Sequence, residues 1–210
     1  MPFSLYDGDS AYIKGGSDDT LIGNVSDRLK VTALSELAES LQTFVVYADG
    51  VATATNKSMV SIVNTSGSTV RVRIREIRII NTRITGATGV PTDLRLLRIV
   101  GHSAGTSLTP SPHDTVDVLD SSITARTGAT VTSEGTAILR RWLISTDEWG
   151  SGAADSESAS HDMQMSNPLY YNVANAKPLT LNANEGFTIK NVTATTTGLF
   201  DIVVVFTQET

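Results

Sequence analysis

The sequence predicts an all-β protein, a jelly-roll-like β-sandwich that follows an extended N-terminal arm and one short helix. Three observations favour this fold class. The chain is rich in Thr, Ser, Gly and Asn, its aromatic content is only 6%, and its apolar residues fall in short β-branched runs such as LFDIVVVF over residues 199–206. Such runs are typical of strands, and turn residues between them at roughly ten-residue spacing are typical of two-sheet sandwiches.

Residues 1–43 differ from the rest and are expected to form an arm with a short helix, ahead of a body over residues 44–210. Gly-Asp, Gly-Gly and Asp-Asp clusters surround short apolar pieces in residues 1–31. This composition buries too little apolar surface to fold alone, so we expect the arm to dock on something. The apolar residues of TALSELAESL, residues 32–41, fall at helical spacing and predict a helix that depends on tertiary contacts.

The body is expected to contain eight or more strands. The turn sequence TSGS at residues 65–68 predicts a hairpin, and Gly-bearing turns predict a second hairpin at the C-terminal end of the chain. The expected strands cover residues 44–47, 59–64, 69–80, 94–101, 122–127, 137–145, 168–173, 187–190 and 199–206.

The strand over residues 69–80 changes its apolar face partway along. Val72 and Ile74 alternate with arginines, whereas Ile77 continues the apolar pattern at an odd offset. A strand shifts its buried face by one residue only where an extra residue is inserted, so a β-bulge is predicted near Arg75 and Glu76.

Composition limits the classes of function. The formal net charge of -6 argues against a protein that coats nucleic acid, because such binding needs a basic surface. The absence of cysteine excludes disulfides, thiolate catalysis and cysteine zinc sites. We find no apolar run of the length a membrane span needs and no basic-then-apolar leader, so we expect no membrane contact and synthesis in the cytoplasm.

Arginines form the strongest charge feature. Arg71, Arg73 and Arg75 alternate along one expected strand, with Arg78 just beyond them and Arg95 and Arg98 in the next strand. One interpretation is a subunit interface, where guanidinium groups pair with carboxylates of a neighbour. The alternatives are a solvated strand face whose charges oppose edge pairing, and, less favoured, a nucleic-acid contact.

The chain is predicted not to be an enzyme and to hold no cofactor or metal. The sequence GHSAG over residues 101–105 matches the Gly-x-Ser-x-Gly of a nucleophile elbow, and His113 follows it. That motif needs a strand–turn–helix context, which the Thr- and Pro-rich sequence after residue 105 opposes, so a surface loop is expected. Turn formation accounts for Asp7, Asp9, Asp18 and Asp19 better than calcium binding does.

Trp149 keeps a different class of function open. It lies beside Asp147 and Glu148, ahead of the polar segment over residues 150–160. An exposed Trp near acidic residues is compatible with a carbohydrate-binding or receptor-binding module, whereas Trp142 is expected to be packed within a strand.

Three stretches resemble structural proteins of tailed-bacteriophage virions. DDTLIGNVSDRLKV over residues 18–31 resembles a "DGTxIGNVxDRLKV" stretch that recurs near the start of such proteins. NKSMVSIVN at 56–64 with REIRIIN at 75–81 resembles the first β pairing of their jelly-roll body, and residues 177–190 through 206–209 resemble its closing strands.

The resemblance implies a non-enzymatic part of the particle, assembled in the host bacterial cytoplasm. We expect first a capsid decoration (cement) protein that binds the major capsid protein, and second a neck, collar or tail adaptor. A symmetric homo-oligomer is expected, with a trimer favoured. The arm and one sheet face would contact neighbouring subunits through Ile13, Leu21, Ile22, Val25, Arg28, Leu29, Arg71, Arg73, Arg75 and Trp149.

Overall fold

The computed structural model describes residues 14–15, 20–21, 41–65, 67–82, 91–146, 169–170, 177–194 and 197–209. Contacts divide the chain into two units, Met1–Leu41 and Gln42–Thr210. In the first unit, β1 (Lys14–Gly15) pairs antiparallel with β2 (Thr20–Leu21). Apart from Leu41, the helix predicted over residues 32–41 lies outside the described residues.

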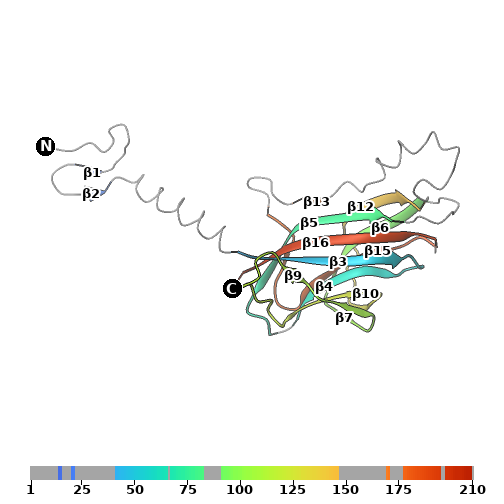
Figure 1. Ribbon diagram of the computed structural model, residues 1–210, viewed down its shortest axis with the longest axis horizontal. Helices are drawn as coiled ribbons and strands as arrows, with labels where there is room; N and C mark the ends of the chain where they lie inside the picture. Colours follow the sequence, from blue (N-terminus) through green and yellow to red (C-terminus); the bar gives the residue numbers. More distant parts are fainter. Residues whose placement is uncertain are drawn as a thin grey trace. The chain divides into compact units, whose positions relative to one another are not determined.

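The second unit is a β-sandwich of two antiparallel six-stranded sheets (Figure 1). The first, here the β4 sheet, has the order β12 (Ile138–Ser145), β6 (Pro91–Ile99), β15 (Glu185–Asn191), β4 (Ser58–Asn64), β10 (Ile123–Thr127) and β8 (Thr106–Leu108). The second, here the β5 sheet, has the order β13 (Leu169–Tyr170), β5 (Arg71–Asn81), β16 (Leu199–Glu209), β3 (Gln42–Ala52) and β9 (Ser111–Pro112), and β14 (Thr180–Leu181) also pairs with β5.

One core fills the space between the two sheets. Alternate apolar residues of β3, β5 and β16 meet those of β4, β6 and β15 in a single buried cluster. Phe44 and Phe206, on neighbouring strands, stack with ring centroids 5.6 Å apart. The predicted all-β sandwich is thus confirmed, whereas the jelly-roll-like connection of its strands stays a prediction.

Both predicted hairpins are wrong, because each turn connects the two sheets instead of two paired strands. β4 pairs with β15 and β10, whereas β5 pairs with β16, β13 and β14. At the C-terminal end, β15 lies in the β4 sheet, while β16 lies between β5 and β3 in the other sheet. Each of these strands has an apolar face to bury, and packing the sheets against each other buries both faces in one core.

The predicted β-bulge in β5 is confirmed. Val205 of β16 lies opposite Glu76, and the next residue, Phe206, lies opposite Ile74, so Arg75 is the extra residue. Buried positions accordingly change from Val72 and Ile74 before the bulge to residues 77, 79 and 81 after it.

A short ribbon lies on the outer face of the β4 sheet. It consists of β7 (Gly101–Ser103) paired with β11 (Thr130–Thr132). Glu134, just beyond β11, forms an ion pair with Lys190 of β15 at 2.8 Å. With the ribbon over them, Ser61 and Thr188 of the outer face are fully buried although they point away from the core.

Candidate functional site

The predicted arginine stripe exists on the outer face of the β5 sheet but is partly neutralised within the chain. Arg73 forms an ion pair with Glu209 at 2.7 Å, and Arg75 Nε donates a hydrogen bond to Thr207 Oγ1 at 3.0 Å. Burial, together with the charge of Arg73, lowers the pKa of Arg75. Arg71 is exposed, so it is the stripe's most accessible charge.

Arg95 and Arg98 do not extend this stripe, because they lie on β6 in the other sheet. Arg95 and Arg141 both bind the carboxylate of Asp93, at 2.7 Å and 2.9 Å. Burial of Asp93 opposes its ionisation, but the two guanidinium groups outweigh burial and hold its pKa below the ordinary value. These charges therefore stabilise the pairing of β6 with β12.

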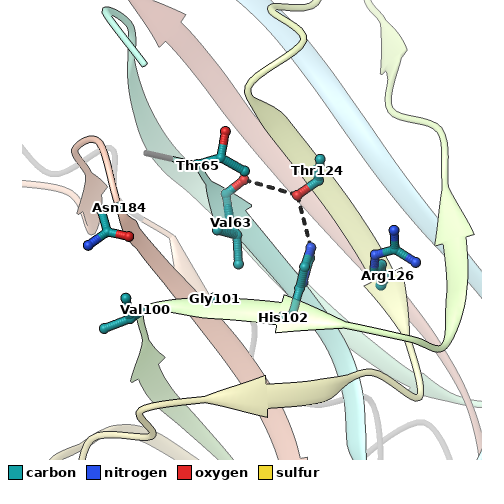
Figure 2. Close-up of a pocket in the computed structure, with 8 residues that line it drawn as sticks. All are labelled: Val63, Thr65, Val100, Gly101, His102, Thr124, Arg126 and Asn184. Atoms are coloured by element: carbon teal, nitrogen blue, oxygen red, sulfur yellow. Dashed lines mark hydrogen bonds between the residues drawn. The ribbon is translucent and has the colours of Figure 1, made fainter. Parts of the chain in front are cut away.

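His102 is held by hydroxyl groups at both ring nitrogens. Nδ1 lies 2.7 Å from Ser61 Oγ of β4, and Nε2 lies 2.9 Å from Thr124 Oγ1 of β10. Thr124 Oγ1 also donates a hydrogen bond of 3.5 Å to the carbonyl oxygen of Val63. Figure 2 draws this hydrogen bond as a dashed line. A Thr124 hydroxyl that donates to this carbonyl accepts from Nε2, which favours the tautomer with its hydrogen on Nε2.

The surroundings of His102 favour the neutral ring. Burial, and after it the charge of Arg126, lower the pKa of His102 to about 4. Near neutral pH the ring therefore carries no charge and can bind both hydroxyls, one as donor and one as acceptor.

A pocket of about 310 Å³ adjoins His102 on the outer face of the β4 sheet. Side chains from four separate parts of the chain line it, and Figure 2 shows them around the end of β7. Its lining combines one cation with amide, hydroxyl and apolar groups, and consists of Val63, Thr65, Val100, Gly101, His102, Thr124, Arg126 and Asn184. Of these residues, the sequence analysis considered only Gly101 and His102, as part of the GHSAG segment.

The GHSAG segment does not form a nucleophile elbow. Gly101 to Ser103 are strand β7, Ala104 and Gly105 make a turn with φ of 55° and 69°, and the chain continues into strand β8. The elbow needs a helix after the turn, and this turn leads into a strand.

Most other candidate residues lie outside the described part of the chain, namely Ile13, Ile22, Val25, Arg28, Leu29 and Trp149. Leu21 belongs to β2. Trp142 is buried on β12 as expected, whereas Leu139 on the same strand is 40% exposed.

No protein-family model, curated protein or solved structure matches this chain. Within the described residues, no three His, Asp or Glu side chains come together in a way that would hold a metal ion. In the same part of the chain, no helix has the length and apolar character that crossing a bilayer requires.

Proposed function

We propose that this protein is a structural component of a tailed-bacteriophage virion, with capsid decoration as its first role. The observation that carries the proposal is the stretch DDTLIGNVSDRLKV at residues 18–31, which resembles virion proteins, placed ahead of a β-sandwich. Contacts separate residues 1–41 from this sandwich as a unit of their own, in keeping with an arm that docks on another subunit.

The mechanism we propose is binding through two surfaces. The arm supplies apolar side chains, and the outer face of the β5 sheet supplies Arg71, Arg73 and Arg75 to carboxylates of a neighbour. An exposed ion pair contributes little by itself, about 0–1 kcal/mol. Many such contacts repeated on a symmetric shell reinforce one another, because each bound surface raises the effective concentration of the next.

The partners would be copies of this chain, as a trimer, and the major capsid protein. A neck, collar or tail adaptor is the alternative within the same class. The two roles differ in symmetry and in the number of copies in a particle.

The deciding experiment measures the mass of the purified protein in solution and its copy number in purified particles. A small symmetric oligomer in high copy number would support decoration, and a ring in low copy number would support the adaptor. A monomer that is missing from particles would refute the virion proposal.

A charge reversal tests the sheet face separately. We expect Arg71→Glu to weaken association with particles, because Arg71 is an exposed charge of the stripe. The matched control is Arg126→Glu, which reverses a charge on the β4 sheet and should leave association unchanged. Equal effects of both variants would argue against the β5 sheet as the contact face.

A further inference from the structure

We propose that the pocket beside His102 binds one carboxylate-bearing sugar unit, as found in acidic polysaccharides. Arg126 would bind the carboxylate, and Thr65 and Asn184 would bind ring hydroxyls. This site is on the β4 sheet and is separate from the particle contacts proposed above.

Arg126 has binding capacity that the described part of the chain does not use. Its Nη1 donates to the carbonyl oxygen of Ala104 at 3.0 Å, while a guanidinium carries five N–H donors in all. Among the described residues, no carboxylate forms an ion pair with Arg126, whereas Arg95 and Arg98 of the same sheet pair with Asp93 and Glu185. A ligand carboxylate would supply the missing partner in the fork geometry that guanidinium groups prefer.

The polar groups on the other side of the pocket suit neutral hydroxyls. Within the described residues, the side chains of Thr65 and Asn184 have no hydrogen-bond partner, and both line the pocket. Asn184 is held in place by its backbone, whose N–H donates to Asn64 O at 2.8 Å, and it has a φ of 64°. A fixed amide and a hydroxyl can each donate and accept, as binding to sugar hydroxyls requires.

Apolar atoms complete the match to a sugar ring. Val63 lies against the pocket, Val100 is 40% exposed at its edge, and the neutral His102 ring forms part of the wall. Sugar rings present C–H faces as well as hydroxyls, so they need such mixed walls. The volume of about 310 Å³ is at the lower end of the range for ligand pockets, which fits one ring of a longer chain.

Nucleic acid fits this pocket less well. Binding a phosphate backbone rests on several cationic groups, and among the described residues that line the pocket Arg126 alone is cationic near neutral pH. The net charge of -6 also opposes a polyanion with dense charge. A sugar unit with a single carboxylate matches a single guanidinium.

The test is an NMR titration of the full-length protein, in which backbone amide shifts report binding. The probes are glucuronate and a glucuronate-containing oligosaccharide, compared with glucose, acetate and inorganic phosphate. We expect the uronates to shift the amides of residues 65, 101–102, 126 and 184, and glucose to shift them much less. No uronate shift, or equal shifts with acetate or phosphate, would overturn the sugar assignment.

Two variants and one control locate the site. Arg126→Gln should weaken uronate binding about tenfold, the loss typical of a charged hydrogen-bond partner. Asn184→Gly keeps the positive φ without strain, removes only the amide, and should weaken binding several-fold. The control Arg71→Gln, on the other sheet, should bind uronate as the wild type does. If the wild type binds uronate and the Arg126 and Asn184 variants bind it equally well, the pocket is not the binding site.

The same variants separate this inference from the virion proposal. Arg126→Gln should still associate with particles, because the pocket is not among the proposed particle contacts. Loss of sugar binding with retained particle association is the expected result. Parallel loss of both in a folded Arg126→Gln protein would mean that the pocket is a particle contact, and would overturn it as a separate sugar site.

Discussion

His102 joins the β7–β11 ribbon to the β4 sheet in its neutral form, and this makes the stability of the protein depend on pH. Its folded pKa of about 4 lies below the ordinary histidine pKa of 6.5. Between these values the unfolded chain binds a proton that the folded chain does not, so stability present above pH 6.5 is lost as the pH falls toward 4. Urea unfolding at a series of pH values should show this decline.

Two variants assign the pH effect to this side chain. His102→Gln should show a flatter decline in the free energy of unfolding between pH 6.5 and 4, because Gln does not titrate. The exposed His113 serves as the control, and His113→Gln should keep the wild-type slope. An identical slope in all three proteins would contradict the role given to His102.

Gly186 shows a second kind of constraint at the residue scale, the close approach of neighbouring strands. A Cβ at this position would lie 2.6 Å from Ile62 O and 2.7 Å from a methyl group of Val63. Gly186→Ala should therefore cost about 1–3 kcal/mol of unfolding free energy, as overpacking does. Gly101→Ala is the control, since its Cβ would meet nothing closer than 3.9 Å.

Equilibrium urea unfolding distinguishes the two glycine variants. A Gly186→Ala protein as stable as Gly101→Ala would mean that the strands separate there at little cost. Either result bears on how rigidly β15 is held between β4 and β6.

Sequence reasoning could not find the pocket at this scale. Thr65, His102, Arg126 and Asn184 are widely separated in the chain, and each is an ordinary residue for a turn or strand. Only the strand order, which places β10 and β15 on either side of β4, brings them together. The spacing of residues in the sequence does not reveal the order of these strands in the sheet.

At the scale of the element, β5 offers a test of its bulge by deletion. Removing Arg75 leaves Ile74, Glu76 and Ile77 in regular alternation, in continuous register with β16. We expect the deletion variant to fold and to lose about 1 kcal/mol, for the hydrogen bond from Arg75 to Thr207. Circular dichroism and urea unfolding measure both.

Deleting Arg73 is the matched control, because it removes an arginine of the same strand from a regular position. The shift by one residue would place Arg75 where Ile74 is now buried and turn Ile74 outward. Loss of a buried Ile costs about 2–5 kcal/mol, and a buried arginine adds to that cost. The idea of a removable bulge fails if the Arg75 deletion is as damaging as the Arg73 deletion.

The same strand shows which features of elements follow from sequence. The bulge was predictable because alternation of Val72 and Ile74 against Ile77 records which face is buried at each residue. The passage from one sheet to the other at residues 65–68 was not predictable, because Ser and Gly suit a tight turn and a passage between sheets equally well. The structure shows contacts of the passage between sheets that the sequence does not reveal. The side-chain amide of Asn64, at the end of β4, donates to Val70 O at 2.9 Å and to Leu181 O at 3.3 Å.

At the scale of the whole molecule, alternation and turn spacing were sufficient for the sandwich but not for its connections. Each strand has one apolar face, so two sheets around one core are the expected solution. Which strand joins which sheet depends on long-range pairing, as for β16, whose neighbours β3 and β5 begin more than a hundred residues earlier in the chain.

The arm gives the prediction at this scale. Among the residues whose burial the structure describes, every member of the buried core cluster lies between Phe44 and Phe206. A protein without residues 1–41 should keep the strands of the sandwich and a similar free energy of unfolding, because the deletion leaves every side chain of this cluster in place. If the arm docks on neighbouring subunits, the shortened protein should no longer bind particles. Circular dichroism, urea unfolding and co-sedimentation with particles test the three expectations. If the shortened protein is unfolded, the arm is required for the sandwich to fold. If it is folded and still co-sediments with particles, the sandwich and not the arm makes the particle contact.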